Sequence, residues 1–327
     1  MVARRETNSD VARLRSDIVA LENHVQQVVE GKPDVVRLTT VALLAEGHVL
    51  LEDVPGVGKT LLAKALARAI SCTVRRVQFT PDLLPADVTG VTVYNAERGE
   101  FEFKPGAVFA NIVLGDEINR AGPKTQSALL EAMEERTVTV DGMTHELARP
   151  FMVIATQNPV ELEGTYPLPE AQRDRFLMRL SIGYPSTEAE LEVLEVHGRG
   201  DRLAQLQPVM DAQHVSMLTK IAESVHAAPA LRSYIVELVR ATRAHPEVEL
   251  GASPRASLAM LRSSRALAAT TGRDFVIPDD IKQLVPPVLA HRLILSPEAQ
   301  MAERQPHDIL SEIVGRTPVP TPDRGRR

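Results

Sequence analysis

The sequence predicts an α/β protein in which a parallel sheet flanked by helices is followed by an all-helical C-terminal domain. Up to about residue 185, short apolar runs alternate with helical patterns, an order typical of a parallel sheet covered on both faces. Beyond that point the strand patterns fade, whereas helical spacing continues. The length of 327 residues is too great for one small core and suits two domains.

The composition narrows the classes of protein to consider. The formal net charge is −6, with both signs mixed along the chain, which disfavours nucleic acid as a partner. A single cysteine, Cys72, excludes an intramolecular disulfide framework. The N-terminus lacks the apolar segment of a secretory signal, and no apolar run is long enough to span a bilayer. We therefore expect a cytoplasmic protein without membrane insertion.

The N-terminal region is expected to begin with a flexible segment at residues 1–15. Apolar residues then recur at helical spacing over residues 16–30, and Gly31 with the following Lys-Pro ends that helix. A second helical pattern covers residues 35–45 and is closed by Gly47.

The first domain, residues 16–185, contains the strand patterns. Strands are predicted at 48–52, 74–79, 111–115, 151–155 and 176–182, and helices at 61–70 and 123–135. Turn residues predict a loop at 81–90. Two hairpins are predicted, one at about 90–105 and one at 137–147, where Asp-Gly supplies the turn.

The second domain, residues 186–314, is predicted to be helical throughout. Its helical patterns fall at residues 187–197, 211–226, 231–244, 253–270 and 278–291. Residues 315–327 are rich in Pro and Arg and poor in apolar residues, so we expect a disordered tail.

The most informative segment is residues 53–60 (DVPGVGKT), which lies between a predicted strand and a predicted helix. This is the context of a phosphate-binding loop, in which glycines let backbone N–H groups point at phosphate. Lys59 would reach the β- and γ-phosphates, and the Thr60 hydroxyl would ligate Mg²⁺. The general pattern has Gly where this chain has Asp53, which affects the expected local shape of the loop.

Two carboxylates, Asp116 and Glu117, end the apolar strand predicted at 111–115. Asp116 at a strand end can hold Mg²⁺, and Glu117 can then polarise the water that attacks the γ-phosphate. An ordinary acidic strand end is the alternative, and the phosphate loop in the same sheet favours the catalytic interpretation.

Three further polar residues follow at positions suited to the same site. Asn158 ends the next strand and would lie beside the γ-phosphate, although Asn-Pro also favours a turn. Arg175, before the last strand, is a candidate charge donor to a neighbouring subunit's nucleotide, with Arg173 as a rival and a surface salt bridge as the alternative role. Arg255 falls in the first turn of a helix that Ser253 and Pro254 would start, where it could point back at phosphate; a solvent-exposed arginine is the alternative.

These motifs, in this order, resemble the MoxR family of AAA+ ATPases. Seven segments carry the resemblance: 79–85 (FTPDLLP), 99–106 (GEFEFKPG), 116–121 (DEINRA), 124–133 (KTQSALLEAM), 155–159 (ATQNP), 163–172 (EGTYPLPEAQ) and 251–255 (GASPR). It extends from residue 16 to about residue 314. The hairpin at about 90–105 resembles the helix-2 insert of that group, and the hairpin at 137–147 resembles the pre-sensor-1 insert.

The resemblance implies an ATPase that uses ATP and Mg²⁺, and it gives each motif a role. Lys59 and Thr60 would be Walker A residues, and Asp116 and Glu117 the Walker B pair. Asn158 would be sensor 1, Arg175 the arginine finger and Arg255 sensor 2, and Gln78 could act as a switch residue on Glu117. Metal binding falls to Thr60 and Asp116. The implied nucleotide-binding residues are Val29, Gly31, Asp53, Pro55, Gly56, Val57, Gly58, Lys59, Thr60, Leu61, Asp116 and Arg255.

By the same resemblance, we expect a ring, specifically a hexamer, that remodels or matures a protein partner in a chaperone-like manner. The partner could carry a von Willebrand factor A domain. The sequence indicates no role for Arg175 within its own subunit, which favours assembly of several subunits into a ring.

Two alternatives resemble this chain in part: the first shares both predicted inserts, and the second shares only the helix-2 insert. One is the motor subunit of a metal-chelatase-like complex, although the sequence offers no tetrapyrrole or metal site. The other is a nucleic-acid translocase, which would need a basic hairpin, whereas residues 92–103 are acidic-leaning.

Overall fold

The structure is a computed structural model that describes residues 2–53, 56–158, 164–184, 187, 191 and 202–320. The chain divides into two compact units. The first unit is Asp17–Thr219, and the second combines Met1–Ser16 with Lys220–Arg327. The predicted boundary at residue 186 lies outside the described residues.

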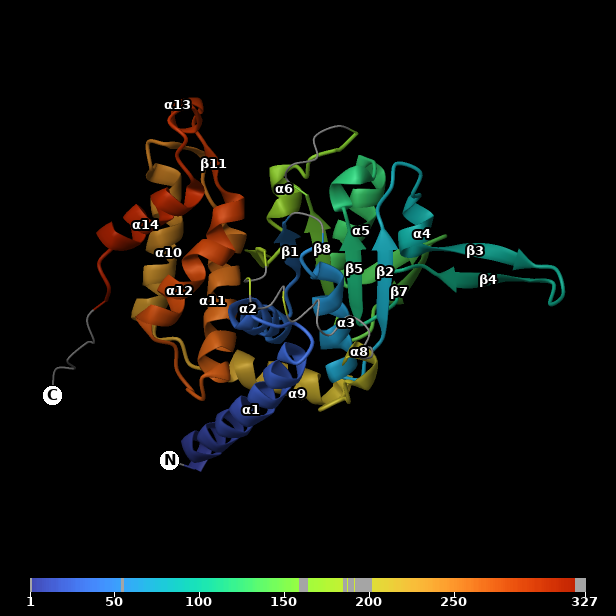
Figure 1. The fold of residues 1–327 in the computed structure, drawn as a ribbon, viewed down its shortest axis with the longest axis horizontal. Helices are drawn as coiled ribbons and strands as arrows, with labels where there is room; N and C mark the ends of the chain where they lie inside the picture. The colour runs from blue at the N-terminus through green and yellow to red at the C-terminus, as the bar shows by residue number, and fades with distance from the viewer. Residues whose placement is uncertain are drawn as a thin grey trace. The chain divides into compact units, whose positions relative to one another are not determined.

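The first unit contains a five-stranded sheet (Figure 1). Its strands are β1 (Val49–Glu52), β2 (Val74–Gln78), β5 (Ile112–Asp116), β8 (Met152–Gln157) and β9 (Met178–Leu180). Their order is β2-β5-β8-β1-β9, and every neighbouring pair is parallel, which confirms the predicted sheet. The carboxyl ends of all five strands therefore lie at one edge, which is where open α/β sheets bind ligands.

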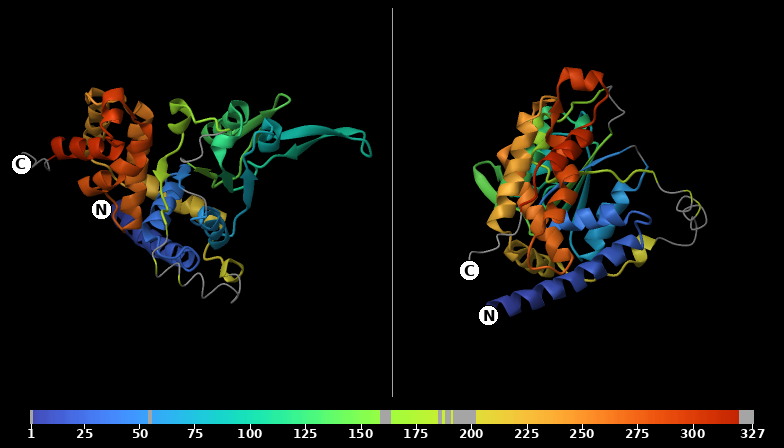
Figure 2. Two further views of the ribbon diagram at one scale, coloured as in Figure 1. Left: turned by 45° about the horizontal axis from the view of Figure 1, so that its top comes forward. Right: turned by 90° about the vertical axis from the view of Figure 1, so that its left-hand side faces the viewer.

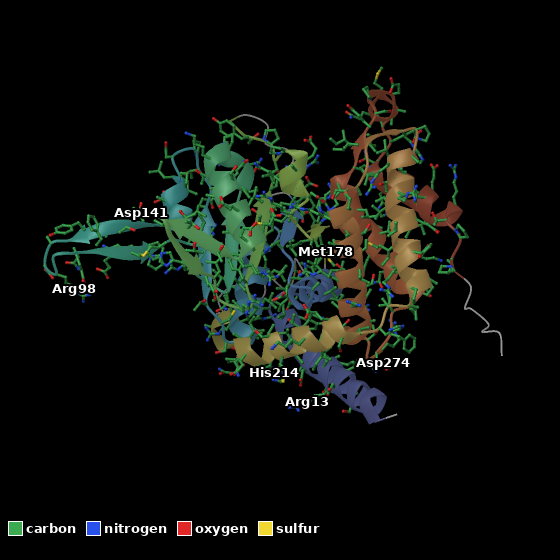
Figure 3. The ribbon with its side chains drawn as sticks, turned by 180° about the vertical axis from the view of Figure 1, so that it is seen from behind. Arg13, Arg98, Asp141, Met178, His214 and Asp274 are labelled. Carbon is green, nitrogen blue, oxygen red and sulfur yellow. The ribbon has the colours of Figure 1, made fainter. Side chains whose placement is uncertain are left out.

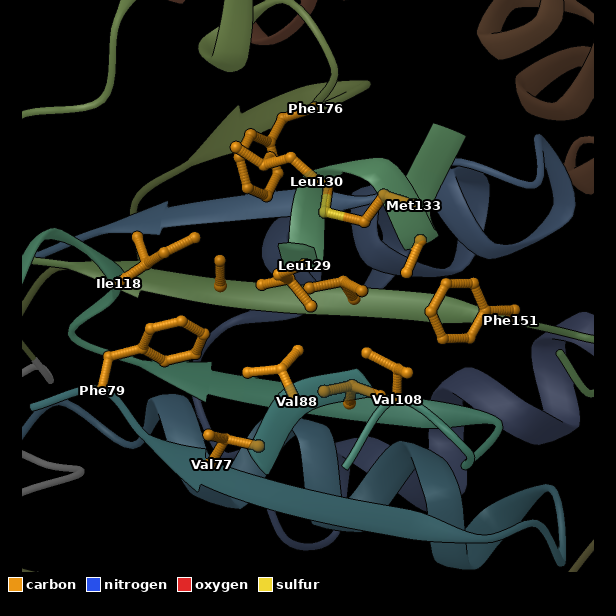
Figure 4. Close-up of a cluster of buried hydrophobic side chains, with 14 of the residues drawn as sticks. Val77, Phe79, Val88, Val108, Ile118, Leu129, Leu130, Met133, Phe151 and Phe176 are labelled. Atoms are coloured by element: carbon orange, nitrogen blue, oxygen red, sulfur yellow. The ribbon is translucent and has the colours of Figure 1, made fainter. Parts of the chain in front are cut away.

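Helices pack on both faces of the sheet because alternate strand residues point to opposite sides. On one face, α4 (Pro85–Thr89) and α5 (Pro123–Glu135) cover a cluster of buried apolar side chains, shown in Figure 4. The helix α3 (Lys59–Ala69) packs on the other face, against β2 and β5. This arrangement fixes the strand ends that carry the predicted site.

The N-terminal helix is longer than the sequence pattern predicted. It is α1 (Val2–Gln26), so the prediction of a flexible segment at residues 1–15 is wrong. The helical spacing of buried residues starts before residue 16, and the stripe consists of Val11, Leu14, Ile18, Leu21 and Val25. The next helix is α2 (Pro33–Leu44), as predicted.

Both predicted hairpins form. One is β3 (Gly90–Asn95) with β4 (Glu100–Pro105), which Figure 2 shows extending well away from the sheet of its unit, and the other is β6 (Thr137–Val140) with β7 (Met143–Glu146). The loop predicted at 81–90 is wrong in part, since it contains α4. Pro85 supplies a suitable first residue, and the Asp87 carboxylate accepts the backbone N–H of Leu84 at 2.9 Å.

Short helices connect the later part of the first unit. They are η1 (Ile118–Arg120), α6 (Glu170–Arg173) and α8 (Arg202–Gln205). The helix α9 (Ala212–Ser224) follows where a helix was predicted at 211–226. Of the helix predicted at 187–197, only residues 187 and 191 are among the described residues.

The second unit is mainly helical. Its elements are α10 (Pro229–Ala244), α11 (Pro254–Thr270), α12 (Pro278–Leu289), η2 (Ala290–Arg292), α13 (Pro297–Met301) and α14 (Pro306–Arg316). It also contains a small antiparallel pair, β10 (Val248–Leu250) with β11 (Ile294–Leu295), which the sequence analysis missed because these strands are only two or three residues long.

The C-terminal tail begins later than predicted. The helix α14 continues to Arg316, and the N–H of Thr317 donates to the Ile313 carbonyl at 2.9 Å, so residues 315 and 316 are ordered in that helix. Residues 321–327 lie outside the described part of the chain. No described helix is long and apolar enough to cross a membrane.

Candidate functional site

The predicted phosphate loop joins β1 to α3. Gly56 and Gly58 have φ values of +86° and +97°, which favour glycine, and space for a Cβ is open at both. Gly58 directly precedes α3, so Lys59 and Thr60 are its first two residues. The Lys59 Nζ donates to the Asp53 carbonyl at 2.7 Å. The loop therefore presents a lysine and a helix N-terminus at one strand end, a combination that suits phosphate.

Asp53 anchors the start of this loop to the segment that follows β9. Its carboxylate accepts the Ser181 hydroxyl at 3.0 Å, the Gly183 N–H at 3.2 Å and the N–H of Ile182. Asp53 is only 8% exposed. A glycine at this position could not make these bonds, so the departure from the general loop pattern has a structural role. The predicted loop residue Pro55 lies outside the described residues.

Asp116, at the carboxyl end of β5, is held by two partners. Its Oδ2 accepts from Arg76 Nε at 2.6 Å, and its Oδ1 accepts from the Thr156 hydroxyl at 3.3 Å. Arg76 lies on β2 and Thr156 on β8, the strands that flank β5. Asp116 is 6% exposed, and this burial strengthens its charge-assisted bond to the guanidinium.

Glu117 follows β5 with a left-handed backbone, φ 56°. Its N–H donates to the Thr156 hydroxyl at 2.9 Å. Its Oε2 accepts from Gln78 Nε2 at 2.8 Å and from Arg120 Nη1 at 3.2 Å. The Gln78 contact is the arrangement expected of a residue that controls where the Glu117 carboxylate points.

Asn158 directly follows β8 and is buried, at the sheet edge that β5 also reaches. Val29 is buried after α1, and Gly31 has a φ of +69°, where glycine is favoured. The structure thus gathers the phosphate loop, the two carboxylates and Asn158 at neighbouring carboxyl ends of one parallel sheet.

Arg175 has a partner in its own chain, which corrects the expectation that it has none. Its Nε lies 3.1 Å from Glu134 Oε2, within ion-pair distance, although the N–H is not aimed in hydrogen-bond geometry. The salt bridge considered as its alternative role is therefore present, with Glu134 as the partner. Arg173 lies 3.9 Å from Glu170.

Arg255 belongs to the second unit. Ser253 is the N-cap of α11, its hydroxyl accepts the Arg255 N–H at 3.1 Å, and Pro254 is the first helical residue. The predicted local geometry is therefore confirmed, and the Arg255 side chain is exposed in the first turn of α11.

The chain matches known families and relatives over most of its length. Residues 48–178 match the ATPase family associated with various cellular activities (AAA), and residues 240–313 match the AAA lid domain. The chain is 54% identical to the uncharacterized protein YeaC of Bacillus subtilis over 91% of this chain and 93% of that protein. It is 43% identical to Chaperone MoxR1 of Mycobacterium tuberculosis over 94% of this chain and 84% of that protein.

The chain belongs to the MoxR family of AAA+ ATPases. A crystal structure of a candidate ATPase from Cytophaga hutchinsonii has the same fold, with a TM-score of 0.91 and 38% identity. That alignment covers 98% of this chain and 100% of the other. The family membership makes the chain an ATPase that binds nucleotide, as the motifs predicted.

Two residues of this MoxR-family site were missed by the sequence analysis. Thr156 links the two acidic residues, since its hydroxyl accepts the backbone N–H of Glu117 and donates to the carboxylate of Asp116. Arg76 pairs with Asp116 although 40 positions separate them. Their signal in the sequence is only positional: Thr156 stands two residues before Asn158, and Arg76 two before Gln78.

The donor set at this site fits a magnesium ion. Asp116 supplies a buried carboxylate held at a strand end, and Thr60 supplies a hydroxyl at the start of α3. Oxygen ligands of this kind suit Mg²⁺, which keeps several waters and takes the remaining ligands from substrate phosphates. The described residues include no group of three or more His, Cys, Asp or Glu placed to hold a metal, and a site completed by phosphates needs none.

Proposed function

We propose that this MoxR-family chain hydrolyses ATP in a Mg²⁺-dependent reaction within a hexameric ring and uses the energy to remodel or mature a protein partner. The observation that carries the proposal is the pair Asp116 and Glu117 at the end of β5, in the same sheet as the phosphate loop after β1. Each residue role below is part of this proposal.

The proposed division of work follows from chemistry and position. Lys59 and the N–H groups at the start of α3 bind and orient the phosphates, and Asp116 and Thr60 hold the metal. Bound Mg²⁺ would neutralise developing charge on the phosphates. Glu117 takes a proton from the attacking water. The oxygen of that water bonds to the γ-phosphorus, and the bond between the γ-phosphorus and the β–γ bridging oxygen breaks. Asn158 orients that water.

An exposed aromatic pair supports a protein partner. Tyr94 and Phe101 face each other across the β3–β4 hairpin, with ring centroids 5.4 Å apart, and Phe101 is 75% exposed. On the same hairpin face, Phe103 stacks on His145. Phe103 is thus packed against His145, whereas Tyr94 and Phe101 are exposed. Exposed aromatic side chains of this kind suit contact with an apolar protein surface.

The hairpin charge disfavours the nucleic-acid alternative. Its carboxylates are Glu97, Glu100 and Glu102, against the cations Arg98, which lies near the turn in Figure 3, and Lys104. Phosphate backbones are repelled by such a surface. The name of the relative Chaperone MoxR1 also supports a protein partner, and one with a von Willebrand factor A domain is our specific suggestion.

A ring in which Arg175 acts on the neighbouring nucleotide is testable by mixing two inactive variants. Arg175 must leave Glu134, and an ion pair whose side chains are 29% and 31% exposed is worth only about 0–1 kcal/mol, so the cost is small. Arg175→Ala should keep ATP binding and lose about 10³–10⁵-fold in turnover. Lys59→Ala subunits should lose ATP binding at their own site, but their Arg175 remains intact and can act on the nucleotide of a neighbouring subunit.

Co-assembled, these two variants should regain part of the activity, because some interfaces pair a working site with a working arginine. Arg173→Ala serves as the matched control and should remain active. If labelled subunits demonstrably mix and no activity returns, Arg175 does not act across subunits. In the same preparation, Glu117→Gln with ATP should retain the protein partner, whereas Lys59→Ala should not.

A further inference from the structure

Arg76 lies on the same face of the sheet as the two carboxylates of the site. Arg76 and Gln78 alternate with Val77, which points into the apolar cluster under α5, so both point to the opposite face, where α3 packs. In the parallel register Gln78 is the partner of Asp116. The side chains of β2 therefore meet those at the end of β5 on the side from which the phosphate loop enters α3.

A continuous chain of contacts links these residues. Arg76 Nε donates to Asp116 at 2.6 Å, and Arg76 Nη2 donates to Gln78 Oε1 at 3.3 Å. Gln78 Nε2 in turn donates to Glu117 at 2.8 Å. The Arg76 guanidinium thus contacts Asp116, the proposed metal ligand, directly. It is linked to Glu117, the proposed catalytic residue, through the Gln78 side-chain amide.

Both oxygens of the Asp116 carboxylate are engaged, Oδ2 by Arg76 and Oδ1 by Thr156. The two partners differ in how easily they leave. Thr156 is 1% exposed and fixed within β8, whereas the Arg76 side chain is 52% exposed and can swing into water. A cation that approaches Asp116 therefore meets the Arg76 guanidinium, which is already bound to the carboxylate but is exposed enough to move away.

We propose that Arg76 is a positioning residue that competes with the metal ion for Asp116, so that metal binding requires Arg76 to leave. Its departure also releases Gln78 from the Arg76 contact, which couples occupancy of the metal carboxylate to the freedom of Glu117. The inference rests on the proposed function, since it assumes that Asp116 holds the metal. It predicts that Arg76 weakens metal binding rather than strengthening it.

The size of the effect follows from the contact. A hydrogen bond to a charged group has a larger effect than a neutral one, but solvent screens this pair in part because the Arg76 side chain is 52% exposed. Loss of the guanidinium should therefore tighten metal binding by about threefold to tenfold. Arg75 provides a matched control, because it is the adjacent arginine and instead donates to the carbonyls of Pro105 and Gly106.

The experiment measures metal affinity without turnover. Each protein is saturated with ADP and titrated with Mn²⁺, and free Mn²⁺ is followed by electron paramagnetic resonance. ADP binding in EDTA is measured separately by calorimetry, and thermal unfolding confirms that each variant is folded. The proteins are wild type, Arg76→Ala, Arg76→Gln, Arg76→Lys and Arg75→Ala.

We expect Arg76→Ala and Arg76→Gln to bind Mn²⁺ about threefold to tenfold more tightly than wild type. Arg76→Lys keeps a cation and should stay within about twofold, as should Arg75→Ala. If both neutral Arg76 variants bind Mn²⁺ as wild type does or more weakly, the inference is overturned. It is also overturned if Arg75→Ala tightens Mn²⁺ binding equally, because that would indicate a general electrostatic effect of positive charge on the strand. Absence of ADP binding by wild type in EDTA would instead count against the proposed function.

Discussion

At the scale of single residues, Glu117 illustrates how the site is prepared. Its left-handed backbone costs about 1–3 kcal/mol for a residue with a side chain, and bonds from its own N–H and carboxylate offset that cost. Thr156 and Gln78 supply these bonds from the two neighbouring strands. Hydrogen bonds from its neighbours consequently hold both the backbone and the carboxylate of Glu117 in place.

Glu22 provides a residue-scale test of burial. Burial raises the pKa of its carboxyl, an effect that Arg37 partly opposes, and its Oε1 is buried without a hydrogen-bond partner among the described residues. The folded state thus binds this proton more tightly than the unfolded chain. The associated stability is present at low pH and is lost as the pH rises through the folded-state pKa.

Glu22→Gln should therefore raise the free energy of unfolding at pH 7 by about 0.5–1 kcal/mol. The gain should shrink as the pH falls toward the ordinary carboxyl value of 4.5, where Glu22 is itself protonated. Chemical unfolding at a series of pH values measures this. The exposed Glu131→Gln serves as control, and a gain that does not depend on pH would contradict the account.

At the scale of elements, Asp53 connects the phosphate loop after β1 to the segment after β9. Asp53→Asn replaces one acceptor oxygen by an amide that faces N–H donors, so it should cost about 1–3 kcal/mol of stability. The same chemical change at Asp141, in the exposed turn of the β6–β7 hairpin, should be nearly neutral because Asn tolerates its φ of 50°. Thermal unfolding of the two variants compares them, and equal losses would remove the anchoring role.

The elements that the sequence predicted well share a strong local signal. The helix predicted at 123–135 matches α5 in both bounds, and the hairpin predicted from residue 137 starts there with β6, since Pro and Gly punctuate these segments. The helix α4 was missed because one turn is too short for periodicity to appear. The early start of α1 was missed because the buried residues Val11 and Leu14 are only two apolar positions in a segment that is otherwise rich in charged and polar residues.

At the scale of the whole molecule, motifs predicted the residue types at the site but not their contacts. Asp116 and Glu117 were identified because a phosphate loop precedes them in the chain. Arg76 and Thr156 could not be identified in this way, since only the sheet order β2-β5-β8 makes them neighbours of Asp116. Sequence also could not reveal that Arg175 pairs with Glu134, because only the fold brings α5 beside the segment that follows α6.

The central claim is that Lys59 binds the nucleotide and Glu117 drives its hydrolysis. Both roles are separated by measuring ATP binding calorimetrically and phosphate release enzymatically on the same proteins, with Lys64→Ala on α3 and Glu131→Gln on α5 as exposed controls. Lys59→Ala should lose ATP binding, whereas Glu117→Gln should bind ATP nearly as wild type does and lose about 10²–10⁴-fold in turnover. Normal turnover by both variants would contradict the account.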